Sequence, residues 1–212
     1  NGLEVKASPR EVAQITGNGV SVTFFQEDGT VQLSCIEDDG NTAFMTRNSE
    51  VSYPVVGGEE VTDFSDFQCE VQENVTGAAG AGSRMTITSI SSGRGIQRSV
   101  VIETVDEVKG LLHISTSYRA EEEVDADEFI DSRFSLDNPS DTVWSYNGGG
   151  EGAQSRYDTL QKIDLSDGES FYRENLQDQT AAGIPVADIY GEDGGITVGD
   201  ASVTRRQLST PV

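Results

Sequence analysis

The chain has 212 residues and is strongly acidic, with 37 Asp and Glu residues against 14 Lys and Arg residues and a formal net charge of −23. Phosphate contacts need clustered Lys and Arg side chains, so this balance argues against nucleic acid as a partner and against binding to an anionic membrane surface. No apolar run approaches the length of about 20 residues that a membrane-spanning helix requires, and no signal-peptide pattern is present.

The excess of negative charge has two interpretations, which the sequence leaves open. It is either a solubilising surface or an adaptation to high salt, where screening removes the repulsion between the acidic side chains. The second interpretation predicts that thermal stability rises steeply with salt concentration.

Two cysteines, Cys35 and Cys69, are too few for a disulfide scaffold and lack the Cys-x-x-Cys spacing. Either one disulfide or two buried thiols agrees with the sequence. With a single histidine in the chain, a zinc site is not expected, and no motif indicates a cofactor.

The first third of the chain consists of short alternating runs separated by turns. Strands are predicted over 12–15, 20–26, 31–36, 43–47, 50–56 and 64–71. The dipeptide Asp28-Gly29 lies between two of these runs and is the strongest hairpin signal in this part. The spacing of strands and turns suits a sandwich of antiparallel sheets.

A glycine-rich segment at 77–82 is predicted to be a surface loop, because no Gly-Lys-Ser/Thr follows to make it a phosphate loop. Longer strands are predicted over 84–90, 97–105, 110–119 and 128–136. His113 lies in mid-strand and is interpreted as structural rather than catalytic. The acidic run 121–128 lacks the glycine and the spaced glutamate of a calcium loop, so it is interpreted as a solvated loop.

The last third begins with a break at Asn138-Pro139-Ser140. An irregular segment is predicted over about 147–180 and a terminal hairpin over about 184–205. Pro185 suits the first residue of a strand, and the turn 192–195 carries residues that tolerate positive φ. No helical period is evident. The predicted fold is therefore all-β, and residues 1–212 are expected to form one domain.

Four sequence blocks follow one another in this last third. They are Trp144-Ser145-Tyr146-Asn147-Gly148-Gly149, then Asp158-Thr159-Leu160, then Phe171-Tyr172-Arg173-Glu174-Asn175, and then the run AGIPVADIYGEDGGITVGD at 182–200. In the same order they resemble W-S-F-Q-G-G, D-W-x, F-x-R-x-N and G-G-I-P-V-V-D-V-W with its following G-G turn. These blocks occur in the N-terminal β-supersandwich domain of alpha-galactosidases of glycoside hydrolase family 36 and relatives. The resemblance covers roughly 142–212.

The resemblance implies a galactose-mutarotase-like supersandwich of antiparallel sheets within a retaining glycoside hydrolase. That chemistry uses two carboxylates about 5–5.5 Å apart, and in the family both lie on a (β/α)₈ barrel that follows this domain. The chain is therefore expected to contribute no catalytic residue. Its expected partners are galactosides, the barrel of the same protein and further copies of that protein in an oligomer.

Four residues are candidate substrate-binding residues. Tyr190 stands where the family more often has a tryptophan that reaches the sugar site, Glu192 and Asp193 lie on the adjoining turn, and Trp144 is a candidate sugar platform. A structural interpretation competes for each of them: Tyr190 and Trp144 pack in a core or an interface, and the two acids simply form the turn.

Two other functions compete with this interpretation. A free-standing carbohydrate-binding or surface-interaction module would bind sugar without a barrel. A mutarotase-type enzyme would need paired histidines, and the chain has only His113, which argues against it. The sequence leaves open whether the protein is cytoplasmic or exported.

Overall fold

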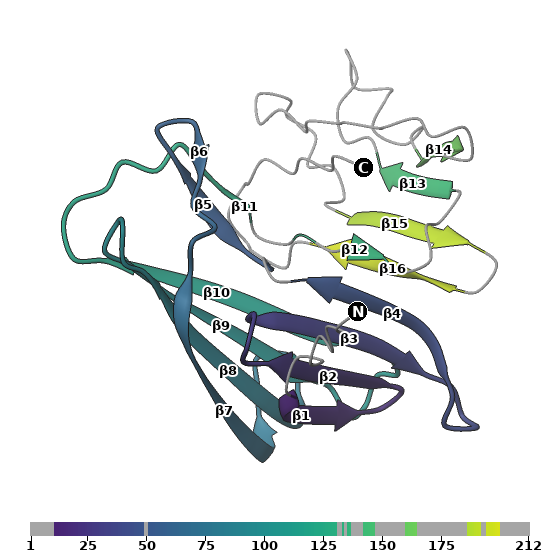
Figure 1. The fold of residues 1–212 in the computed structure, drawn as a ribbon. Coiled ribbons are helices and arrows are strands. Elements are labelled where there is room, and N and C mark those ends of the chain that lie inside the picture. The colour runs from purple at the N-terminus through teal and green to yellow at the C-terminus, as the bar shows by residue number, and fades with distance from the viewer. Residues whose placement is uncertain are drawn as a thin grey trace, which may run out of the picture. The chain divides into compact units, whose positions relative to one another are not determined.

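The computed structural model describes residues 11–48, 51–130, 133, 135–136, 142–146, 160–164, 186–191 and 194–199 (Figure 1). Every regular element in these ranges is a strand, and all the strand pairs are antiparallel. The all-β antiparallel prediction is thus confirmed. Among the residues described, no helix is long and apolar enough to cross a membrane. The chain divides into two compact units, residues 1–137 and 138–212, and the expectation of one domain over 1–212 stays a prediction.

The described residues of the first unit form three sheets. Sheet A has the strand order β1-β2-β3-β4-β12, sheet B the order β11-β5-β6, and sheet C the order β10-β9-β8-β7. Sheet A comprises β1 (Glu11–Gly17), β2 (Val20–Phe25), β3 (Thr30–Ile36), β4 (Thr42–Asn48) and β12 (Ser135–Leu136). Sheet B comprises β5 (Tyr53–Val56), β6 (Glu59–Glu60) and β11 (Glu128–Ile130). Sheet C comprises β7 (Ser65–Thr76), β8 (Ala81–Ser91), β9 (Ile96–Thr104) and β10 (Leu112–Ala120).

The predicted hairpin at Asp28-Gly29 is present. Strands β2 and β3 pair up to Phe25 and Thr30, and Gly29 takes a φ of 71°, which a glycine adopts without steric cost. The Asp28 carboxylate accepts a hydrogen bond from the Thr30 N–H at 2.9 Å and so closes the turn on itself.

The predicted loop at 77–82 is two residues too long, because Ala81 and Gly82 already belong to β8. Gly82 lies directly against the backbone carbonyl of Thr104, where a side chain would not fit. Gly82 is therefore a strand residue, and it is a glycine because β8 and β9 approach each other closely at this point.

Alternating apolar residues of sheets A and C form the main core, with β1 to β4 lying across β7 to β10 in Figure 1. The fully or nearly buried members on these strands are Ile15, Val22, Phe24, Val31, Leu33, Met85, Ile87, Val100 and Ile102, and Val51 joins them from the segment between β4 and β5. A second cluster lies around sheet B and contains Tyr53, Val55, Val61, Phe64 and Ile96. Phe67 of β7 packs against both clusters.

Sheet D belongs to the second unit and has the strand order β14-β13-β15-β16. Its strands are β13 (Thr142–Tyr146), β14 (Leu160–Asp164), β15 (Val186–Gly191) and β16 (Gly194–Gly199). Strands β15 and β16 form a hairpin within the range 184–205. Strand β14 lies inside the segment 147–180 that the sequence predicts to be irregular. Its five residues are too few for their alternation to stand out from the polar sequence around them.

Candidate functional site

Two of the four predicted sugar-binding residues lie on neighbouring strands of sheet D. Trp144 of β13 pairs with Asp188 of β15, and Tyr190 follows two positions after Asp188. Tyr190 itself pairs with Thr142, so Trp144 and Tyr190 lie on adjacent strands at diagonal register positions. Glu192 and Asp193 lie outside the described residues, between the paired Gly191 and Gly194.

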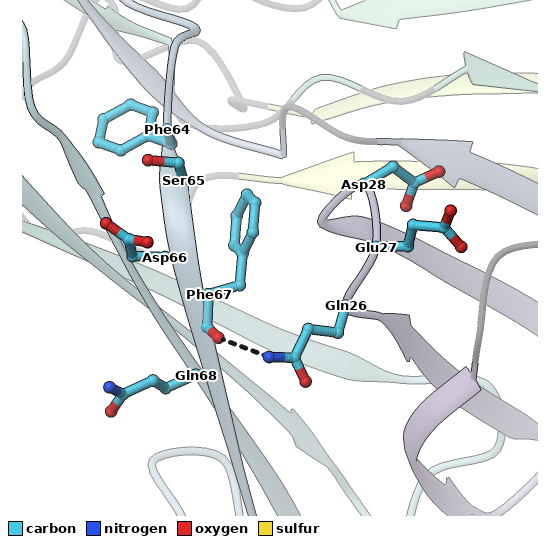
Figure 2. Close-up of a pocket in the computed structure, with 8 residues that line it drawn as sticks. All are labelled: Gln26, Glu27, Asp28, Phe64, Ser65, Asp66, Phe67 and Gln68. Atoms are coloured by element: carbon cyan, nitrogen blue, oxygen red, sulfur yellow. Dashed lines mark hydrogen bonds between the residues drawn. The ribbon is translucent and has the colours of Figure 1, made fainter.

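A groove in the first unit lies between the β2–β3 turn and the start of β7, and sequence reasoning missed it (Figure 2). Its volume is about 640 Å³. Its lining residues combine acids, amides and aromatic rings, and they are Gln26, Glu27, Asp28, Phe64, Ser65, Asp66, Phe67 and Gln68.

A β-bulge in β7 shapes one wall of this groove. The pairing of β7 with β8 shifts between Ser65 and Gln68, and Asp66 takes a φ of 55°. A bulge leaves its residues unpaired and bends the strand, so this segment turns towards the β2–β3 turn. There the Gln26 Nε2 atom donates a hydrogen bond to the Phe67 carbonyl at 3.2 Å (Figure 2).

Contacts with buried side chains fix the aromatic rings of the groove. Phe64 is buried, and the guanidinium of Arg98 lies 3.9 Å from the centre of its ring, a cation–π contact. Arg98 also donates to the Ser52 carbonyl at 2.6 Å. Phe67 lies at a tilt to Phe24, with 6.1 Å between ring centres. These contacts fix both rings, and of the two only the partly exposed Phe67 can meet a ligand in the groove.

Three carboxylates, those of Glu27, Asp28 and Asp66, are exposed around the same groove. Carboxylates accept hydrogen bonds from hydroxyl groups, and side-chain amides both accept from and donate to them. The negative charge favours a neutral or cationic ligand over an anion. The groove thus has the polar groups that would bind a polyhydroxylated or amine-bearing ligand.

A second hollow of about 520 Å³ lies beside the acidic run, and its lining includes Arg94, Glu123, Asp125 and Asp127. Asp127 is used structurally, because its carboxylate accepts a hydrogen bond from the Gly58 N–H at 2.7 Å. Across the residues that the structure describes, no three acidic, histidine or cysteine side chains gather as ligands of a metal ion would.

His113 belongs to a cross-strand row of three ionisable side chains in sheet C. Glu103 of β9 faces Arg84 on one side and His113 on the other. The buried Glu103 carboxylate accepts from Arg84 Nε at 2.8 Å and from the Ala78 N–H at 3.0 Å, and His113 Nδ1 lies 3.4 Å away. Burial alone would raise the pKa of Glu103. The Ala78 N–H and Arg84 outweigh it and hold that pKa below its ordinary value.

Both cysteines are free thiols in partly buried positions. Burial raises the pKa of the Cys69 thiol to about 11. The thiolate is the reactive form, so this site offers little nucleophilic chemistry near neutral pH.

No protein-family model matches the chain. Over 199 residues it is 51% identical to a protein of Flavonifractor plautii named A type blood alpha-D-galactosamine galactosaminidase, which by this name is a glycoside hydrolase. The match covers 93% of this chain and 18% of that protein. The chain therefore spans less than a fifth of the length of this relative.

Proposed function

We propose that this chain is a non-catalytic domain of a larger glycoside hydrolase that acts on galactose-type sugars. One observation carries the proposal: nearly the whole chain matches at 51% identity, yet it matches only 18% of a galactosaminidase. The remaining length of such a protein is ample for a separate catalytic domain.

The resemblance of the last third to family 36 alpha-galactosidases points to the same proposal. It predicts that the two catalytic carboxylates lie on a barrel outside this chain. The sugar would be an alpha-linked galactoside or its 2-amino form, since the relative's name specifies alpha-D-galactosamine. The domain would support the barrel, complete one wall of the sugar site and contribute to an oligomer.

In this proposal Tyr190 and Trp144 offer ring faces to the sugar, and Glu192 and Asp193 offer hydrogen-bond acceptors. The diagonal positions of Trp144 and Tyr190 on sheet D support a shared role for the two rings. Ring stacking of this kind contributes about 1 kcal/mol, which corresponds to roughly a fivefold to tenfold change in affinity.

The first test compares the full-length gene product with the 212-residue chain on p-nitrophenyl alpha-galactoside and alpha-galactosaminide. We expect release of nitrophenol by the full-length protein only. Hydrolysis by the isolated chain would refute the non-catalytic role, and a gene product no longer than this chain would leave no room for a barrel.

The second test concerns the sugar-site residues in the full-length protein. Tyr190→Ala should raise KM about fivefold to tenfold, and Tyr190→Phe should leave KM near the wild-type value because the ring remains. An unchanged KM in Tyr190→Ala, at unchanged melting temperature, would assign Tyr190 to packing instead.

A free-standing carbohydrate-binding module is the second candidate, and the groove of Figure 2 favours it, because this groove presents a ring wall and carboxylates within the first unit. Calorimetric titration with galactose, galactosamine and raffinose distinguishes the two functions. Saturable binding by the 212-residue chain that is lost in Asp66→Asn or Glu27→Gln supports the module, and absence of heat supports the domain of a larger enzyme.

A further inference from the structure

Strand β10 forms one edge of sheet C, and this edge is unusually regular. All nine of its residues pair with β9 without a register shift. Among the described strands it is the longest edge strand with an unbroken register, because β1 and β7 are both shifted. It also contains no proline and no glycine. A straight edge of this kind is a template for another strand.

The register shows which backbone groups of β10 point away from β9. The Glu121 N–H donates to the Gly95 carbonyl at 3.1 Å, directly in line with the β9–β10 ladder. Since hydrogen-bonded positions alternate along antiparallel strands, the odd-numbered residues bond to β9. The even-numbered residues then direct their N–H and C=O groups outward. In the part of the chain that the structure describes, no strand pairs with this outer side.

The hydrogen bonds between β9 and β8 give the same assignment of odd and even positions. The Asp106 N–H donates to the Ala81 carbonyl at 2.9 Å, in line with the β8–β9 ladder. Even-numbered positions of β9 and its extension therefore bond to β8, which leaves the odd-numbered positions for β10. The outward donors of β10 include Leu112, Ile114 and Thr116.

The opposite edge of sheet C is built differently. Strand β7 is interrupted by two register shifts, between Ser65 and Gln68 and between Gln72 and Val75. Asp66 and Asn74 lie at these bulges with positive φ values of 55° and 54°. Bulges twist an edge away from pairing, so β7 is protected against strand addition and β10 is not.

Apolar side chains flank the β10 edge at both ends. Four large hydrophobic residues are exposed in the described part. Two of them, Val108 (48%) and Leu111 (40%), come shortly before β10 in the chain, and a third, Phe129 (51%), contacts Tyr118 of β10. The ring centres of Phe129 and Tyr118, near the end of the strand, lie 5.3 Å apart. The edge thus offers apolar contacts beyond its backbone groups.

The charges around β10 specify the partner. Asp106 and Glu107 precede the strand, and at its far end the exposed Arg119 is followed by three exposed glutamates at 121–123. Lys109, the basic residue at the first end, is already paired with Asp38 at 2.7 Å. A second copy of this acidic chain would bring the same carboxylates against each other, whereas Lys or Arg at both ends of an incoming strand would complement them.

We propose that the β10 edge binds an extended segment of another polypeptide, which adds to sheet C as a strand. The segment has about nine residues, apolar residues at alternate positions, and Lys or Arg at both ends. Backbone hydrogen bonds to the outward groups of Leu112, Ile114 and Thr116 supply affinity, and the acidic ends supply specificity. This inference is independent of the function proposed above.

The test uses the full-length chain and the labelled peptide Lys-Lys-Val-Thr-Val-Thr-Val-Lys-Lys, followed by fluorescence anisotropy. We expect saturable binding, with slower hydrogen–deuterium exchange in peptic fragments that contain β10. A matched peptide with proline in place of the central valine keeps its charge but loses a strand donor, and should bind at least about tenfold more weakly. A version with glutamates at both ends should not bind.

Two protein variants test whether the peptide binds at β10. Thr116→Pro removes an outward donor at a position where an edge strand tolerates proline, and we expect affinity to fall at least about tenfold. Thr116→Val keeps the donor and should retain wild-type affinity. If Thr116→Pro does not fold, the proline-containing peptide and the exchange map decide the result.

Three outcomes would overturn the proposal. Equal binding of the two lysine-flanked peptides would show that charge alone attracts them. Protection of β7 or β1 in place of β10 would place the binding elsewhere. A dimer in sedimentation, with β10 protected in the absence of peptide, would make a second copy the occupant.

Discussion

Gly29 lies so close to the ring of Phe67 that no side chain fits between them. A Cβ atom on Gly29 would overlap Cζ of that ring and lie 2.6 Å from Cε2. Gly29 lies on the β2–β3 turn and Phe67 on the bulged start of β7. Their contact therefore packs the two sides of the groove in Figure 2 against each other.

The first prediction concerns this contact. Gly29→Ala combines a positive φ with a steric clash, so it should destabilise the protein by about 2–5 kcal/mol, of which about 1–2 kcal/mol comes from the backbone and about 1–3 kcal/mol from overpacking. Gly40→Ala is the matched control, because Gly40 has a φ of 84° and no atom lies within 4 Å of the place that an alanine Cβ would take. Urea unfolding measures both, and equal losses would show that the Phe67 contact costs nothing.

The second prediction follows from Glu103. Its folded-state pKa is depressed below the ordinary value of 4.5, so its ionised form stabilises the folded state at pH values above 4.5, and this contribution is lost as pH falls through the folded pKa. Glu103→Gln should lower stability by about 1–3 kcal/mol at neutral pH and flatten the decline below pH 4.5. Urea titrations from acidic to neutral pH measure this, and an equally steep decline in the variant would assign the acid sensitivity to other carboxylates.

The third prediction concerns thiol reactivity. With a pKa of about 11 in place of 9.0, Cys69 carries about 100-fold less thiolate near neutral pH than an ordinary thiol. Iodoacetamide should therefore modify it about 100-fold more slowly in the folded chain than in urea, as followed by mass spectrometry of the Cys69 peptide. Equal rates in the two states would contradict the burial of this thiol.

The fourth prediction separates the two interpretations of the net charge of −23. If the chain is adapted to high salt, screening of the carboxylates should raise the melting temperature steeply between low and molar sodium chloride. Sodium chloride and potassium chloride should act alike, since screening depends on ionic strength. A melting temperature that stays constant over this range would leave only the solubilising role.

Local signals in the sequence predict much of the fold. The Asp28-Gly29 dipeptide and the alternating residues on both sides identify β2 and β3 within about one or two residues, because a turn and a half-buried strand are properties of neighbouring residues. The groove has no such signal. It depends on the packing of Gly29 against Phe67 and on a bulge in β7, and both arise only when distant strands come together.

The row Arg84–Glu103–His113 shows the same limit. Each residue looks ordinary in its own strand, and the register of three strands is what aligns them. The sequence alone names Tyr190 and Trp144 as separate candidates, Tyr190 through the resemblance of the last third to a known family. Sheet D then adds their diagonal relation, and their contact with sugar stays a prediction.

The ring of Phe67 links the two apolar clusters of the first unit. Because its ring packs against both apolar clusters of the first unit, loss of order around sheet B removes a contact from the core between sheets A and C. The two clusters are therefore energetically coupled, and this unit should melt in a single transition. Truncation of that one ring to alanine should split the transition in two.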